Sequence, residues 1–222
     1  MLHLEVPGGG SDVLLHSCCA PCSGAVLECL LASGIRPTVF FSNSNIVPRE
    51  EYELRRTELE RYCRSLGVEM VDDEYDHEAW LAFVLERDAG APAERQAALA
   101  AAPERAGRCL NCFKFRLKRA AEFAAKRGIP VLTTTLASSR WKSLEQVAEA
   151  GAWACGETAG PSSSAGKPQP DRNPGHNGTP SVLFWPQNWR KGGLQERRGQ
   201  IICEQNFYNQ TFCGCEFSHR SV

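Results

Sequence analysis

Cysteine pairs are the residues of this chain whose types and spacing point most directly to chemistry. Cys18 and Cys19 are adjacent after an apolar stretch, and Cys109 and Cys112 lie three residues apart in a basic segment. Soft thiolates bind iron–sulfur clusters or zinc, and adjacent ligands suit a cluster better than the spaced pairs of structural zinc sites. The four cysteines therefore predict the ligands of one iron–sulfur cluster, with zinc or no metal as alternatives.

Cys22 gives the first cysteine group a competing interpretation. The run Cys19-Ala-Pro-Cys22 has the form of a thioredoxin-type motif, in which a strand leads to Cys-x-Pro-Cys at the start of a helix. That interpretation leaves Cys18 and the other cysteine pairs without a role. Cys22 itself stays open between a ligand of a second metal and a bystander. Cys29 and Cys63 lie on apolar helix faces, so we expect packed thiols there.

The third pair, Cys213 and Cys215, is separated by one glycine. A disulfide across a single residue closes a small ring in which the usual dihedral angle of about 90° is hard to reach. Such a bond is strained and easily reduced, which suits a reversible electron relay better than a structural crosslink. The pair predicts redox chemistry, and two unpaired cysteines are the alternative.

Length and composition favour a domain with an ordinary hydrophobic core over a small disulfide-stapled protein. The chain has 222 residues and 11 cysteines, and Met1 to Asp12 lacks the charged and apolar regions of an export signal. No apolar run approaches the roughly 18 residues of a membrane span. We therefore expect a cytoplasmic protein without a membrane segment, in a reducing compartment where clustered cysteines serve metal or redox chemistry.

Basic residues are concentrated in one segment although the net charge of the chain is −1. Residues 105–127 include eight Lys or Arg and one acidic residue, Glu122. This pattern suits a polyanion such as RNA, with a solvated helix face as the alternative. The predicted basic strip centres on Lys114, Arg116, Lys118 and Arg119. Aromatic candidates for stacking on bases are Trp141, Trp189, Tyr208 and Phe212, with packing in the core as the alternative for each.

Short apolar runs alternate with amphipathic helices, which predicts an α/β fold with a parallel sheet. Strands are expected at 13–16, 39–41, 68–71 and 129–136, and ordered sequence resumes at 182–185 after a polar run. Helices are expected at 23–34, 48–67, 77–85, 92–102, around Cys109 up to Gly128, 141–150 and 194–205. Residues 1–222 form a single catalytic domain in this prediction, and the run 156–179, rich in Gly, Pro and Ser, is a disordered insertion.

The predicted elements place the cysteines where a ligand site is expected. Cys18 and Cys19 lie between the first strand and the next helix, at the carboxyl edge of the sheet where such folds bind ligands. Cys109 and Cys112 begin a helix and project from one face. The positive helix terminus, with Arg108 nearby, should favour their thiolates.

Three cysteine motifs occur in one order along the chain. They are His16-Ser17-Cys18-Cys19-Ala20-Pro21-Cys22-Ser23, Cys109-x-x-Cys112 with Arg116, and Tyr208-x-Gln210-x-Phe212-Cys213-Gly214-Cys215-x-x-Ser218. Together they resemble the QueH family of non-cobalamin epoxyqueuosine reductases, from about Leu14 to Ser218. Where the family favours Tyr-Asn-Pro-Asn and Ser-Pro-Tyr-Lys, this chain has Ser42-Asn43-Ser44-Asn45 and Ser139-Arg140-Trp141-Lys142. Those differences concern substrate contacts and not the cluster.

The resemblance implies an oxidoreductase that removes the epoxide oxygen of epoxyqueuosine at the wobble position of tRNA, giving queuosine and water. A [4Fe–4S] cluster would be bound by Cys18, Cys19, Cys109 and Cys112, and a redox-active pair formed by Cys213 and Cys215. A second iron near Cys22 stays open. The implied partners are the tRNA anticodon loop and an electron donor of unknown identity. The implied fold is a parallel-sheet sandwich resembling the adenine-nucleotide α-hydrolase (HUP) group.

Two other functions compete with this one. An iron–sulfur tRNA thiolase that uses ATP needs a glycine-rich phosphate loop after the first strand. Here that loop has no glycine before Gly24, and Pro21 removes a backbone donor. The second competitor is a zinc-stabilised RNA-binding module, which would be colourless where an iron–sulfur protein is brown.

Overall fold

Five parallel strands form the sheet at the centre of the molecule, in the order β3-β2-β1-β4-β5. The structure is a computed structural model, and it describes residues 2–158 and 181–218. The strands are β1 (Asp12–His16), β2 (Arg36–Phe41), β3 (Met70–Asp72), β4 (Val131–Thr134) and β5 (Leu183–Phe184). The predicted α/β class is confirmed, and the all-parallel sheet flanked by helices is consistent with a HUP-like sandwich.

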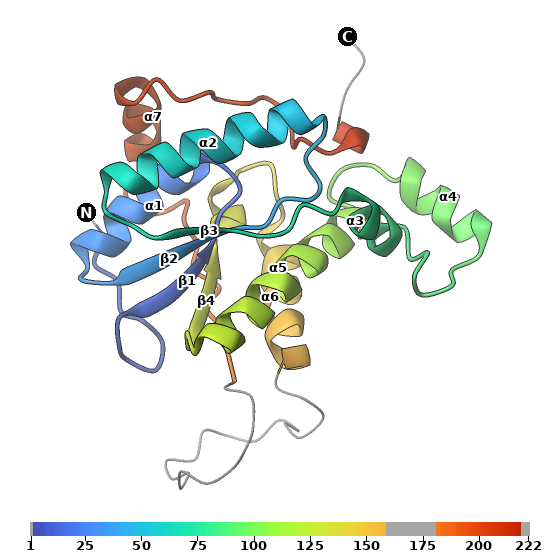
Figure 1. Ribbon diagram of the computed structural model, residues 1–222, viewed down its shortest axis with the longest axis horizontal. Helices are drawn as coiled ribbons and strands as arrows, with labels where there is room; N and C mark the ends of the chain where they lie inside the picture. Colours follow the sequence, from blue (N-terminus) through green and yellow to red (C-terminus); the bar gives the residue numbers. More distant parts are fainter. Residues whose placement is uncertain (1, 159–180, 219–222) are drawn as a thin grey trace, which may run out of the picture.

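Helices cover both faces of the sheet (Figure 1). One face carries α1 (Ala20–Ala32), α2 (Arg49–Ser65) and α7 (Leu194–Glu204), and α1 contacts the other two. The other face carries α5 (Gly107–Arg127) and α6 (Leu144–Thr158), with α3 (His77–Val84) and α4 (Ala93–Ala101) packed on α5. Short 3-10 turns complete the described chain at η1 (Thr135–Ser138) and η2 (Glu216–Ser218).

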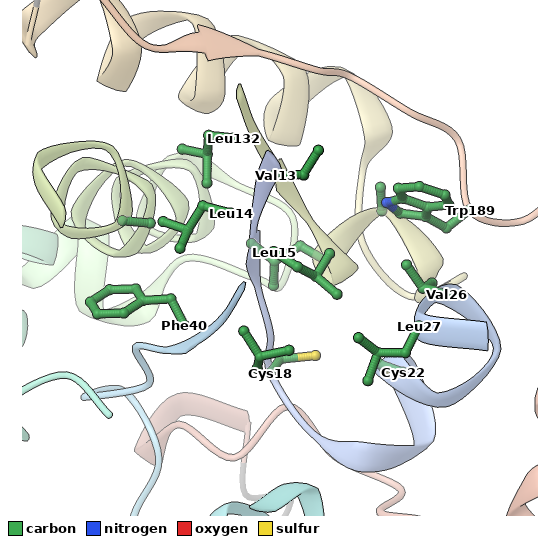
Figure 2. Close-up of a cluster of buried hydrophobic side chains, with 14 of the residues drawn as sticks. Val13, Leu14, Leu15, Cys18, Cys22, Val26, Leu27, Phe40, Leu132 and Trp189 are labelled. Atoms are coloured by element: carbon green, nitrogen blue, oxygen red, sulfur yellow. The ribbon is translucent and has the colours of Figure 1, made fainter. Parts of the chain in front are cut away.

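The central strand β1 is buried on both sides, which explains its apolar sequence. Leu14 points to the same side as Phe40 and Leu132, whereas Leu15 points to the opposite side, toward Val26 (Figure 2). Side chains alternate in this way because successive residues of a strand face opposite surfaces of the sheet. All five side chains are at most 3% exposed. The carboxyl end of β1 is therefore anchored in the core from both faces.

The chain reverses its direction of progress across the sheet at β1, because β2 and β3 lie on one side of it and β4 and β5 on the other. In open parallel sheets such a switch point opens a crevice beyond the carboxyl ends of the two diverging strands. The segments that follow β1 and β4 meet there. They are the cysteine run that begins at Cys18, and η1 with the loop that leads to α6.

Several predicted boundaries differ from the structure. Helix α1 begins at Ala20 rather than Ser23, because a proline in the first turn costs no helical hydrogen bond. The hydroxyl of Ser23 donates to the Cys19 carbonyl at 2.8 Å instead of capping the helix. Helix α6 runs to Thr158, so the first three residues of the predicted insertion are helical. The rest of that insertion, 159–179, lies outside the described residues.

The described helices can be compared with the length and apolar character of a membrane span. Within residues 2–158 and 181–218, no helix has both the length and the apolar character needed to cross a bilayer. The longest helix, α5, has 21 residues and carries many charges.

Candidate functional site

The segment between β1 and α1 brings three sulfur atoms together. The Sγ atoms of Cys18 and Cys19 lie 3.8 Å apart, and those of Cys18, Cys19 and Cys22 are all within 4.8 Å of one another. All three side chains are buried. Three soft donors at this spacing fit a thiophilic metal ion or cluster iron. Cys22, which the sequence left open, therefore belongs to the cysteine triad.

Two distant segments contact the sulfurs of this triad. The Thr135 hydroxyl, at the end of β4, accepts from the Cys18 backbone N–H at 3.2 Å and lies 3.6 Å from the Cys18 sulfur. The side-chain amide of Gln210 donates to the Cys19 sulfur at 2.7 Å. The triad is thus held by the sheet on one side and by the C-terminal part of the chain on the other.

The triad contains one acidic thiol and two that hold their protons. Hydrogen bonds from Cys19 and Cys22 lower the pKa of Cys18 well below its ordinary value. Burial raises the pKa of Cys19, and the hydrogen bond to Cys18 raises that of Cys22 to about 11. Metal binding requires thiolates, so a metal that enters the triad must displace protons from the last two.

Cys109 and Cys112 lie in the first turns of α5, as predicted, but their thiolates are not favoured. Burial raises the pKa of both thiols. The charge of Arg108 lowers the pKa of Cys109, as expected, but burial outweighs it, and the Arg108 guanidinium also donates to the Leu99 carbonyl at 2.6 Å. Without a metal, this pair is neutral.

The C-terminal loop, residues 206–215, returns to the sheet edge and ends in the third cysteine pair. The Arg55 guanidinium donates to the Cys213 carbonyl at 3.0 Å, and the Val47 N–H donates to the Gly214 carbonyl at 2.9 Å. Gly214 has φ +104°, and a Cβ there would lie 3.1 Å from the Arg55 nitrogens. Only glycine fits this turn without strain.

The two thiols of the third pair differ in acidity, because they are hydrogen-bonded to each other and Lys142 lies beside one of them. The Lys142 Nζ lies 3.6 Å from the Cys213 sulfur. A hydrogen bond from Cys215, together with the charge of Lys142, lowers the pKa of Cys213 well below its ordinary value. The hydrogen bond to Cys213 raises the pKa of Cys215 in turn. Both are free thiols in the structure. The pair is therefore one thiolate beside one thiol, the state that starts disulfide exchange.

All three cysteine groups line one cavity of about 920 Å³. Its walls include six cysteines, which come from the β1–α1 segment, α5 and the C-terminal loop: Cys18, Cys22, Cys109, Cys112, Cys213 and Cys215. Seven cations line it against a single acidic residue, Glu104; they are Arg55, Arg105, Arg108, Arg116, Arg140, Lys142 and Arg198. The cavity is therefore suited to anionic contents, both thiolate-bound metal and a phosphate-bearing substrate.

The predicted basic strip on α5 is not a free cationic surface. Arg116 is 2% exposed and donates to the Ser42 carbonyl at 3.1 Å. Lys114 pairs with Glu149 at 3.3 Å. Arg119 binds Asp73, with one N–O distance of 2.8 Å. Three of the four cations in the strip are thus already engaged within the protein, which composition does not show, while RNA binding by Lys118 stays a prediction.

Sequence reasoning did not assign roles to the polar residues that position the cysteines. Arg55 forms a buried ion pair with Glu51 at 2.5 Å, and Lys142 and Gln210 contact sulfur directly. Gln210 stood inside a quoted motif and could have been found there. The pairing of Arg55 with a residue 158 positions away left no local signal.

Among the remaining candidates, Cys29 and Cys63 are buried as predicted. The Cys29 thiol donates to the Leu2 carbonyl at 3.2 Å. Trp189 is fully buried, so its predicted stacking role is wrong. Trp141 is 64% exposed and stands in the cavity wall.

A parallel α/β sheet whose switch point gathers cysteines from three segments around one cationic cavity defines a thiol-rich protein equipped to bind metal. A family model for epoxyqueuosine reductase QueH matches residues 13–162 and 174–221. The chain belongs to the epoxyqueuosine reductase QueH family. The internal gap in this match, residues 163–173, lies within the predicted insertion.

Relatives from distant bacteria match nearly the whole chain. Epoxyqueuosine reductase QueH of Haemophilus influenzae is 38% identical over 217 residues, which cover 98% of this chain and 75% of the relative. The protein of that name from Acinetobacter baylyi is 35% identical over 221 residues, covering 100% and 86%. The one from Thermotoga maritima is 30% identical over 210 residues, covering 93% and 89%.

Proposed function

We propose that this protein reduces epoxyqueuosine to queuosine at the wobble position of tRNA. The observation that carries the proposal is the convergence of three cysteine groups on one cationic cavity in a chain of this family. In this proposal residues 1–222 act as a single catalytic domain, and a tRNA substrate together with unpaired cysteines supports a cytoplasmic location.

The residues that would hold a [4Fe–4S] cluster are Cys18, Cys19, Cys109 and Cys112. The donor set supports this assignment, because all four are thiols and three of them line the same cavity. Cys22, within 4.8 Å of Cys18 and Cys19, is the natural ligand of a second iron. When bound, such a centre passes electrons singly, and an iron with an open position is a Lewis acid for an epoxide oxygen.

The third cysteine pair supplies the two electrons that the reduction consumes. Deoxygenation breaks both carbon–oxygen bonds of the epoxide, forms a carbon–carbon double bond and releases water, so it consumes two electrons and two protons. Oxidation of Cys213 and Cys215 to a disulfide releases two electrons. The Cys215 thiol supplies one proton and the Lys142 ammonium, 3.6 Å from the Cys213 sulfur, supplies the other. A separate electron donor then reduces the disulfide.

The cavity also suits the substrate. A wobble nucleotide lies in a single-stranded loop, so its modified base can leave the stack and enter a pocket while its phosphates meet cations at the rim. Arg140 and Arg198, both in the cavity wall, are the cations that replace the predicted strip in this role.

The test is turnover of a defined substrate. Protein reconstituted anaerobically with iron and sulfide should absorb at about 400 nm and convert an anticodon stem-loop that contains epoxyqueuosine, with a chemical reductant, into the queuosine form. Mass spectrometry of the digested RNA detects the loss of one oxygen atom. A colourless zinc-loaded protein that binds RNA without converting it would contradict the proposal in favour of the RNA-binding module. Sulfur transfer that depends on ATP would favour the thiolase.

A further inference from the structure

Trp141 is the most exposed large apolar side chain in the part of the chain that the structure describes. It is 64% exposed, whereas Trp80, Trp185 and Trp189 are buried and Trp153 is half-buried. Folding alone gives no reason to leave an indole ring in water at this position. Single exposed aromatic residues are common on protein surfaces, however, so exposure alone does not indicate a function. The residues around the ring must supply that evidence.

The backbone that carries Trp141 is fixed by side chains from distant segments. Arg105 donates to the Trp141 carbonyl at 2.7 Å and to the Arg140 carbonyl at 3.1 Å. Arg190 donates to the Lys142 carbonyl at 2.7 Å and also to the Ser139 carbonyl. Four consecutive carbonyls are thus held from outside the loop. The ring is presented by a rigid support, and little conformational entropy remains to be lost on binding.

Arg105 links this support to the cysteine site. It has φ +67°, a conformation that a residue with a side chain adopts at a cost. In this conformation its backbone N–H donates to the Cys109 sulfur at 3.3 Å while its guanidinium holds the Trp141 loop. The position of the exposed ring is therefore coupled to the mouth of the cavity and not to a remote surface.

The positive charge around the Trp141 ring indicates which kind of partner it binds. The Arg140 guanidinium carbon lies 5.0 Å from the centroid of the Trp141 ring, and both residues belong to a cavity wall with seven cations and one acidic residue. A cation beside an exposed aromatic face is the arrangement that binds single-stranded nucleic acid, since bases stack on the ring and phosphates meet the cation. An apolar protein partner would need a larger uncharged patch.

We propose that Trp141 and Arg140 form a stacking platform for a base that flanks the nucleotide held in the cavity. The Trp141 ring stacks on the face of one unstacked loop base, and the Arg140 guanidinium forms an ion pair with the adjacent phosphate. This inference rests on the proposed function and extends it, because it names the residues that bind the RNA beside the reacting nucleotide. It is sequence-tolerant, since every base offers an aromatic face.

The experiment measures the dissociation constant of the reconstituted protein for a dye-labelled anticodon stem-loop by fluorescence anisotropy. Trp141→Ala should weaken binding about 10-fold, within the range of about 5- to 150-fold that one lost base stack represents. Trp141→Phe should bind within about twofold of wild type, whereas Trp141→Leu should be as weak as the alanine variant, because leucine offers apolar surface without a ring. Leu54→Ala, which removes another exposed apolar side chain, is the matched control and should change nothing.

A second measurement reports on the ring itself. Iodide should quench a fraction of the tryptophan fluorescence that is lost in Trp141→Phe, and RNA should protect that fraction in wild type. A dissociation constant unchanged in Trp141→Ala, or rescue by leucine as complete as by phenylalanine, would overturn the platform. If wild type converts the substrate while Trp141→Ala binds normally, only the platform fails. If wild type binds RNA without converting it and Trp141→Ala binds weakly, the platform stands and the proposed function fails.

Discussion

The cysteine triad and the C-terminal loop contribute sulfur to the same cavity, but they are built in opposite ways. The triad, Cys18, Cys19 and Cys22, spans the junction between the central strand β1 and the first turn of α1, so the fold itself positions it. The C-terminal loop has no strand or α-helix. Its cysteines are held by polar contacts, chiefly the Arg55 bond to the Cys213 carbonyl.

This difference separates two requirements of the proposed chemistry. Ligands of a metal centre must keep their geometry through every turnover, and a core-anchored sheet edge provides that rigidity. A thiol pair that alternates between dithiol and disulfide must rearrange, and a loop fastened by a few polar contacts allows it. The predictions below remove parts of one region and ask whether the other is unaffected.

The largest effect is expected from the redox pair. Cys213→Ser and Cys215→Ser should each reduce turnover of epoxyqueuosine stem-loop about a thousandfold or more, because neither variant can form the disulfide that balances the reaction. Both should keep wild-type iron and sulfide, since other thiols are assigned to the cluster. Mild oxidation of wild type should give a Cys213–Cys215 disulfide in peptide mass spectrometry. If both variants lose iron and no disulfide forms, these residues are ligands.

Arg55 should matter both for stability and for the position of the loop. Arg55→Met leaves Glu51, whose side chain is 11% exposed, without its partner, and should lower the free energy of unfolding by about 3–5 kcal/mol. Turnover should fall as well, because the Cys213 carbonyl loses its donor. Chemical denaturation and a turnover assay measure the two effects.

A second variant separates these two roles of Arg55. Adding Glu51→Gln to Arg55→Met should restore part of the stability but not the turnover. The control is Arg64→Gln, whose exposed pair with Glu60 in the same helix should cost less than about 1 kcal/mol. Full recovery of turnover in the double variant would show that Arg55 acts only through stability.

Gly214→Ala should have an intermediate effect. A side chain at φ +104° is strained, and its Cβ would lie 3.1 Å from Arg55, so we expect a loss of about 1–2 kcal/mol and a displaced thiol pair. Gly199→Ala is the matched control, because Gly199 lies within α7 with nothing near its missing Cβ. That change should stabilise the protein by about 0.5–1 kcal/mol. Equal effects of the two substitutions would contradict the close fit around Gly214.

The smallest effect concerns a buried thiol outside the site. Burial raises the pKa of Cys63 from 9.0 to about 12. Between those values the unfolded chain releases this proton and the folded chain keeps it, so stability falls as pH rises, by up to about 1.4 kcal/mol per pH unit. Cys63→Ala should flatten the slope of unfolding free energy between pH 8 and about 10.5, whereas Cys203→Ala, at an exposed site, should not. An unchanged slope in Cys63→Ala would mean that another group titrates.

The local pattern of apolar residues, glycines and prolines was sufficient to predict most of the fold. Every predicted strand has a counterpart, because buried parallel strands read as apolar runs and glycines such as Gly34, Gly67 and Gly128 end the preceding helices in the left-handed region. The start of α1 was predicted three residues late. Ser23 is a residue type that often caps a helix, which indicated a start there, whereas Pro21 is equally acceptable in a first turn that begins at Ala20. Either boundary satisfied the local rules.

The site was only partly readable from the sequence. Cysteine types and the sheet-edge rule identified the three sulfur groups, since both depend on residues close in sequence. The roles of Arg55, Lys142 and Arg105 were not assigned from the sequence, because their partners are 36 to 158 residues away. Arg116 was assigned to the surface because its charge is visible in the sequence and its burial is not.

The central claim is that cysteines from β1–α1 and from α5 bind one cluster in one cavity. The most direct measurement is iron and sulfide per chain after anaerobic reconstitution of Cys109→Ser, with Cys18→Ser beside it and Cys63→Ser as the buried-thiol control. The account predicts that the first two lose the cluster together and that Cys63→Ser keeps it. Full iron and sulfide in Cys109→Ser, with loss only in Cys18→Ser, would show that α5 supplies no ligand and would contradict the shared site.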